Sequence, residues 1–173
     1  MADLHIDWMK PIRLPKEGKH SLAIDTDSIP KAPGVYMFFR RVGTNSTEVV
    51  YVGKAANLKG RTTGHQNNHA LITALLETEG TYYLMPGRFK PLPGQNSKTS
   101  IRTIERVIIR TCIEDGHPLI NIAGARIKTQ HVVSTLPAGS KFLSEKIGFE
   151  PVAHKKKGAA KKAGTKRKPA AGK

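Results

Sequence analysis

The pattern of apolar and polar positions predicts three β-strands in the middle of the chain. Residues 34–41 (GVYMFFRR) and 49–54 (VVYVGK) are runs of β-branched and aromatic residues, a composition typical of strands. The polar, turn-rich segment VGTNST joins them, which predicts a β-hairpin. A third run, TYYLM at 81–85, predicts another strand.

Helical spacing of apolar residues predicts two helices and one helical turn. Asn57 is expected to cap a first turn at LKGR, and residues 70–77 (ALITALLE) repeat apolar residues at helical intervals. The clearest helix covers 101–115 (IRTIERVIIRTCIED). We expect Ser100 to cap it and Gly116 to end it.

These elements predict an α+β domain whose small antiparallel sheet of about three strands is flanked by helices, in the order β-β-α-β-α. We expect an irregular lead-in over 1–30, with room for one short edge strand, and the domain proper over 31–123. An extension over 124–153 is expected to pack on the domain. It would add a short strand near 131–133 and a helical turn near 142–146. Residues 154–173 form a separate tail.

Charge changes this picture by indicating a polyanionic partner. The chain has 29 Lys and Arg against 13 Asp and Glu, a formal net charge of +16, which favours nucleic acid. The tail alone holds nine basic residues and no acid, with no apolar side chain larger than Ala. We therefore expect it to be a disordered arm that contacts phosphates without reading bases.

Other composition signals indicate where the protein works. No run approaches the roughly 18 apolar residues that span a bilayer, so a membrane partner is disfavoured. The first residues lack the apolar core of a secretory signal. One cysteine, Cys112, excludes an intrachain disulfide and fits a reducing compartment. We expect a cytoplasmic, DNA-associated protein, with a nuclear location as the alternative because of the basic cluster at 166–168.

The helix at 101–115 contains an acidic residue on its apolar face. At 100° per residue, Ile101, Ile108, Ile109 and Cys112 flank Glu105 on both sides. A buried carboxylate without a partner is costly, so a cation is expected beside it. Periodicity leaves two candidates open, an arginine or a hard divalent metal ion.

A glycine-rich basic segment follows the second predicted strand. Within YVGKAANLKGRTTGH, Lys54, Lys59 and Arg61 lie among glycines that allow the backbone to approach a ligand closely. Arginine presents a planar fork to phosphate oxygens, and lysine lowers the cost of forming an anion. Such a loop is also compatible with an ordinary solvated surface.

Taken in order, these residues resemble the GIY-YIG endonuclease superfamily. GVY at 34–36 and YVG at 51–53 resemble the two signature motifs, with Val in place of Ile in both. The resemblance covers roughly 31–123, and YVGKAANLKGR is similar to the nuclease module of nucleotide-excision-repair incision enzymes. The family's further positions are matched here by Lys54, Arg61, His65, Glu105 and Asn121.

The resemblance implies a metal-dependent endonuclease that hydrolyses DNA phosphodiester bonds at a single site. Glu105 would hold one Mg²⁺ or Mn²⁺, and Arg61 would bind a phosphate oxygen. Tyr36 would orient or deprotonate the attacking water, with cationic help from Lys54 because a phenol normally has a pKa near 10.

The remaining family positions would support these groups. Tyr51 and His65 would complete the hydrogen-bond network, while Gly53, Lys59 and Asn121 would lie on the substrate side.

A second interpretation is a non-catalytic, architectural DNA-binding protein that uses the nuclease fold and basic tail for docking. RNA is an alternative nucleic-acid partner, because charge alone does not distinguish it from DNA. Either a monomer or a homodimer is compatible with the sequence.

Overall fold

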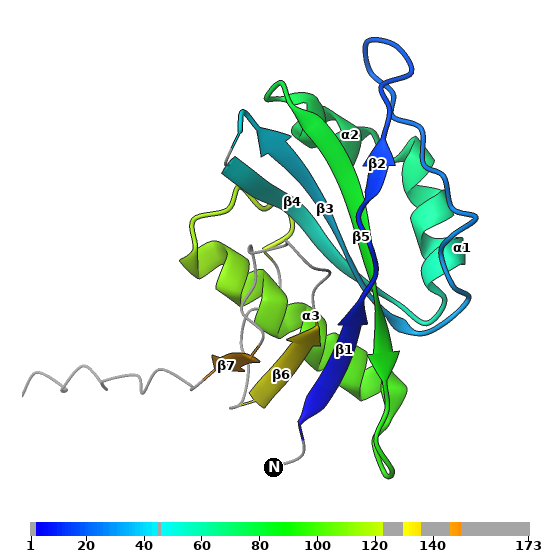
Figure 1. The fold of residues 1–173 in the computed structure, drawn as a ribbon, viewed down its shortest axis with the longest axis vertical. Coiled ribbons are helices and arrows are strands. Elements are labelled where there is room, and N and C mark those ends of the chain that lie inside the picture. The colour runs from blue at the N-terminus through cyan, green and yellow to red at the C-terminus, as the bar shows by residue number, and fades with distance from the viewer. Residues whose placement is uncertain (1–2, 45, 123–129, 136–145, 150–173) are drawn as a thin grey trace, which may run out of the picture.

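The computed structural model describes residues 3–44, 46–122, 130–135 and 146–149, and confirms an α+β fold. Its sheet has the order β4-β3-β5-β1-β6-β7, with β2 pairing with β5 alongside this path (Figure 1). Pairing is antiparallel except between β1 and β6. The strands are β1 (Leu4–Trp8), β2 (Ile12–Leu14), β3 (Gly34–Val42), β4 (Ser46–Ala55), β5 (Thr81–Lys90), β6 (Gln130–Thr135) and β7 (Lys146–Phe149).

Helices cover both faces of this sheet (Figure 1). On one face, α3 (Ser97–Glu114) packs its apolar stripe against β1, β3, β4 and β5. On the other face lie α1 (Leu58–Thr63), the 3₁₀ turn η1 (Gly64–Asn67) and α2 (His69–Leu76). The two apolar clusters therefore form separate cores, one for each face.

A β-bulge in the β3–β4 hairpin determines which side chains reach which core. Phe38 pairs with Tyr51 and Phe39 pairs with Val49, so Val50 has no partner. Val49 joins the α3 core, whereas Val50 and Tyr51 both lie on the α1–α2 face. An extra residue of this kind reverses the alternation of all later positions in its strand.

The helix ends agree in part with the sequence pattern. Asn57 caps α1 as predicted, since its side chain accepts from the Gly60 amide. The expected cap of α3 is wrong: α3 begins four residues before Ile101, and Asn96 caps it while Ser100 is buried. After α3, Gly116 adopts a φ of 76°, which glycine tolerates best, and ends the helix as expected.

The sheet is larger than the predicted three strands. All three predicted strands are present, but β5 continues through Pro86 and Gly87 to Lys90, although these residue types usually end strands. The expected irregular lead-in contains β1 and β2. Moreover, β1 is not an edge strand, because it lies between β5 and β6.

Only some of the predictions for residues beyond 123 fall on residues that the structure describes. β6 confirms the expected short strand near 131–133, whereas Lys146, expected in a helical turn, begins β7. Residues 142–145 and the tail over 154–173 lie outside the described residues. In the described part of the chain, no helix combines the length and apolar character needed to cross a bilayer.

A buried arginine ties α2 to the β3–β4 hairpin. Arg40, in β3, is only 4% exposed. Its Nε donates to Glu48 in β4 at 2.7 Å, and its Nη1 donates to the carbonyl oxygens of Ala74 and Leu75 at 2.8 and 3.3 Å. These carbonyls belong to the last turn of α2, which has no partners for them within the helix. Arg40 thus acts as a C-terminal cap supplied by the sheet.

We expect Arg40→Met to destabilise the protein by about 2–3 kcal/mol. The substitution removes charged hydrogen bonds and leaves the carbonyl oxygens of Ala74 and Leu75 without the donor that Arg40 provides. Urea denaturation at pH 7 measures this loss. Arg41→Met is the matched control: Arg41 lies over the Tyr83 ring at 5.1 Å, and its loss should cost less than about 1 kcal/mol. Equal effects of the two variants would contradict the capping role.

Candidate active site

Three aromatic side chains on the α1–α2 face surround the first signature tyrosine, Tyr36. The Oη of Tyr36 lies 2.7 Å from Nε2 of His65 in a buried hydrogen bond. The Tyr36 and Tyr51 rings stack at 6.2 Å between centroids, and Phe38 meets the His65 ring edge-on at 5.3 Å. Three residues of the family pattern are therefore brought into one cluster by β3, β4 and η1.

Gly53 is required by the position of the Tyr36 ring. The two residues pair across β3 and β4. A Cβ atom on Gly53 would lie 2.4 Å from the Tyr36 Oη, well inside contact distance. The second signature glycine therefore provides the space that the first signature tyrosine occupies.

Burial controls the protonation of this cluster. Desolvation raises the pKa of Tyr36 above its ordinary value, and the nearby Tyr51 adds to the rise, while Arg61 opposes it by hydrogen bonding and charge. Desolvation, with a smaller contribution from Arg61, lowers the pKa of His65 to about 4. At neutral pH both Tyr36 and His65 are therefore uncharged, with the exposed Arg61 cation beside them.

The candidate metal ligand lies on the opposite face of the sheet. Glu105, on α3, forms an ion pair with Lys54 of β4. The Glu105 side chain is 13% exposed and that of Lys54 is 41% exposed. The carboxylate on the apolar stripe thus has a cation beside it, but the cation is a lysine from the sheet and not an arginine.

Adjacent residues of β4 connect the two groups. Gly53 lies against the phenol of Tyr36, and the next residue, Lys54, faces Glu105 on the other side. β4 is the edge strand on this side of the sheet. The structure therefore places the predicted residues on the two faces beside this strand and not on one face.

Asn121 holds this edge in place. Its Oδ1 accepts from the amide of Val52 at 3.2 Å, and its Nδ2 donates to the carbonyl of the same residue. The amide of Ile120 donates to Val50 at 3.0 Å. The side-chain amide of Asn121 thus takes the place of a neighbouring strand. It satisfies the backbone N–H and C=O of Val52, which lies between the two signature residues Tyr51 and Gly53.

Lys59 pairs with a carboxylate outside the candidate site. Its ammonium donates to Asp27 at 3.1 Å, in the segment before β3. Since Asp27 is 94% exposed, this pair is expected to contribute little stability. The expected substrate-side role of Lys59 stays a prediction. Cys112 is buried in the α3 core, and burial raises the pKa of its thiol to about 12, which fits a packing role.

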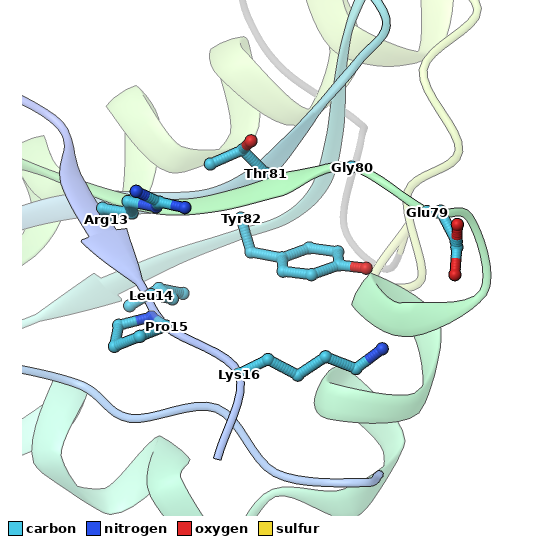
Figure 2. Close-up of a pocket in the computed structure, with 8 residues that line it drawn as sticks. All are labelled: Arg13, Leu14, Pro15, Lys16, Glu79, Gly80, Thr81 and Tyr82. Carbon is cyan, nitrogen blue, oxygen red and sulfur yellow. The ribbon is translucent and has the colours of Figure 1, made fainter. Parts of the chain in front are cut away.

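One recess of the described residues adjoins the site, and another lies farther along β5. One, of about 560 Å³, adjoins Lys54 where β4 ends and α3 begins, and it is mostly apolar. Its lining consists of Pro33, Lys54, Ala55, Ala56, Ser97, Lys98 and Ile101. A second recess, of about 290 Å³, lies at the start of β5, and its lining includes Arg13, Lys16, Glu79 and Tyr82 (Figure 2). Tyr82 lies four residues, roughly 13 Å along the strand, from the Tyr36 partner Pro86.

The chemistry of Glu105 is compatible with a hard divalent cation. Among the described residues, no group of three or more His, Cys, Asp and Glu side chains is placed to hold a metal ion. Mg²⁺ commonly uses one or two carboxylates together with water and substrate phosphate. A carboxylate that already attracts a cation, and whose side chain is 13% exposed, fits that requirement once Lys54 moves aside.

Comparison with known proteins shows similarity over part of the chain. It is 47% identical over 51 residues to UvrABC system protein C of Neisseria meningitidis, covering 28% of this chain and 8% of that protein. The same-named protein of Christiangramia forsetii is 42% identical over 52 residues, 30% of this chain and 8% of the relative.

The extent of these matches limits what they show. The chain spans about 8% of the length of the relatives that it matches. No family model and no solved structure matches the chain. The similarities confirm the resemblance to the GIY-YIG superfamily seen in the sequence.

One residue of the cluster was not selected from the sequence. Asn68, the residue between η1 and α2, places its Nδ2 3.3 Å from Nδ1 of His65. An asparagine before a helix is ordinarily interpreted as a cap, and Asn68 is one. Nothing in the linear pattern indicates its second contact.

We expect Gly53→Ala to cost about 1–3 kcal/mol of stability, because the added methyl overlaps the Tyr36 phenol. Urea denaturation measures the change. Gly64→Ala is the control, since Gly64 has a helical φ of −65° and open space around its Cα, so it should be neutral or slightly stabilising. A neutral Gly53→Ala would show that the Tyr36 ring is not confined as described.

We expect His65 to make stability fall as pH decreases from 7 to 5. The unfolded chain takes up a proton near pH 6.5, whereas the folded His65 resists it until about pH 4. Relative to His65→Gln, the wild type should lose about 2 kcal/mol over this interval. Urea titrations of both proteins at pH 7 and pH 5 test this. A constant difference between them would mean that His65 protonates normally in the folded state.

Proposed function

We propose that this protein is a metal-dependent endonuclease that hydrolyses DNA phosphodiester bonds at a single site. The observation that carries the proposal is the convergence at Gly53 and Lys54. There adjacent residues of β4 link the Tyr36–His65–Arg61 cluster on one face to the Lys54–Glu105 pair on the other, so a phosphate bound beside these two residues would be near both groups. The similarity to UvrABC system protein C and the net charge of +16 support DNA as the partner.

Each group has a chemical role in this proposal. Arg61, which is exposed and lies beside Tyr36, would bind a phosphate oxygen and stabilise the charge that develops on it. Glu105 would hold Mg²⁺ or Mn²⁺, whose chemistry when bound is to polarise the scissile phosphate and stabilise the leaving 3′-oxygen. Lys54 would then lose its carboxylate partner, and its ammonium would become available to the substrate.

Tyr36 would orient or deprotonate the attacking water. Two features of the cluster bear on this role. The residue has no exposed surface, so the water can reach its oxygen only if Arg61 or Tyr51, its more accessible neighbours, shifts when DNA binds. The raised pKa of Tyr36 also means that a phenolate requires cationic stabilisation, which Arg61 supplies.

The burial of Tyr36 and the engagement of Glu105 by Lys54 favour a second candidate function. A protein that only docks on DNA would have no need to expose these groups. In that case the fold and basic surface would provide non-specific affinity, and no condition would produce cleavage.

The test is cleavage of supercoiled plasmid with Mg²⁺, with Mn²⁺ and with EDTA, by wild type and by Glu105→Gln. We expect metal-dependent nicking that Glu105→Gln reduces at least about a hundredfold, the order of magnitude for loss of an essential catalytic group. Plasmid binding, measured by mobility shift in EDTA, should be nearly unchanged.

Glu114→Gln is the matched control, because Glu114 lies on the same helix and pairs only with Arg110 among the interactions that the structure shows for it. It should cleave at the wild-type rate. Binding without cleavage under every metal condition would support the docking protein instead.

A further inference from the structure

The side-chain amide of Asn68 accepts one hydrogen bond and donates another. Its Oδ1 accepts from the backbone amide of Leu71 at 3.2 Å and thereby caps α2. Its Nδ2 then faces Nδ1 of His65 at 3.3 Å. The backbone adds a third link, because the Asn68 amide donates to the carbonyl of His65 at 3.0 Å. The cap therefore fixes which end of the amide the imidazole meets.

This orientation determines where the His65 ring carries its proton. An amide NH₂ group can only donate, so Nδ1 must be the unprotonated, accepting nitrogen. The single proton of the neutral ring is then on Nε2, and Nε2–H donates to the Tyr36 oxygen 2.7 Å away. The opposite tautomer would turn this bond around and would place Nδ1–H against the NH₂ group.

We propose that Asn68 is a positioning residue that holds His65 in its Nε2–H tautomer, so that His65 donates to the Tyr36 oxygen. A donor on the phenolic oxygen stabilises negative charge there, and the charge of the nearby Arg61 acts in the same direction. The phenol proton of Tyr36 is then directed away from His65.

The consequence for cleavage rests on the proposed nuclease function. With Nε2–H, the Tyr36 oxygen accepts a donor that helps it to take up charge or to orient a water. With Nδ1–H, the phenol would donate into His65, and its oxygen would lose one stabilising donor. Loss of the correct histidine tautomer can reduce catalysis by orders of magnitude even where the geometry is unchanged.

The chain offers a matched set of substitutions. Asn68→Asp keeps an acceptor for the Leu71 amide and so keeps the cap. Its carboxylate can only accept from the imidazole, however, which demands Nδ1–H. Asn57→Asp is the control, because Asn57 caps α1 through the same kind of bond to Gly60. It adds the same charge at a neighbouring helix cap without touching His65.

The first measurement is the His65 tautomer in the full-length, metal-free protein labelled with ¹⁵N-histidine, read from ring ¹⁵N–¹H correlations at pH 8. We expect Nε2–H in wild type and in Asn57→Asp, and Nδ1–H in Asn68→Asp. Nδ1–H in wild type, or an unchanged tautomer in Asn68→Asp, would overturn the proposal.

The second measurement is single-turnover cleavage at saturating DNA with Mg²⁺. We expect Asn68→Asp to be at least about tenfold slower than Asn57→Asp, with equal urea denaturation midpoints for the two variants. A flipped tautomer with an unchanged rate would overturn the positioning role. If wild type does not cleave at all, the nuclease proposal fails, while the tautomer result still decides the assignment of Asn68.

Discussion

The bulge at Val50 is the constraint on which the candidate site depends. An uninterrupted pairing would send Tyr51 and Gly53 to the α3 face and Lys54 to the α1–α2 face. With one extra residue in β4, Tyr51 and Gly53 instead join Tyr36, and Lys54 meets Glu105. The bulge, and the local twist that accompanies it, lie on the edge strand of the sheet. One unpaired valine thus sets the composition of both groups.

Much of the fold was predictable because local patterns and tertiary packing agree. The hairpin of β3 and β4, the start of β5 and the apolar stripe of α3 all follow from side chains that pack where their periodicity places them. The ordered motifs also identified most members of the candidate site. The expectation that Glu105 needs a cation was sound, since burial penalises a lone carboxylate whatever its partner.

Other features depend on contacts that a linear pattern does not carry. VVYV at 49–52 is a continuous apolar run, so nothing in it marks Val50 as the unpaired residue. β1 is short, and its identity as an interior strand comes from β5 and β6, which are far away in sequence. The Lys54–Glu105 pair joins residues 51 positions apart. Asn68 likewise looks like a simple helix cap until the His65 ring is placed beside it.

The interior position of β1 has a consequence for how the chain folds. Leu4–Trp8 pairs with residues 87–90 of β5 and with residues 132–135 of β6. During synthesis, β1 must therefore wait until its first partner has emerged, with its apolar residues Leu4, Ile6 and Trp8 without their final contacts. Closing such long loops is entropically costly and slows folding. An early amphipathic strand that must wait for its neighbours is the segment where chaperone binding would matter most during biogenesis.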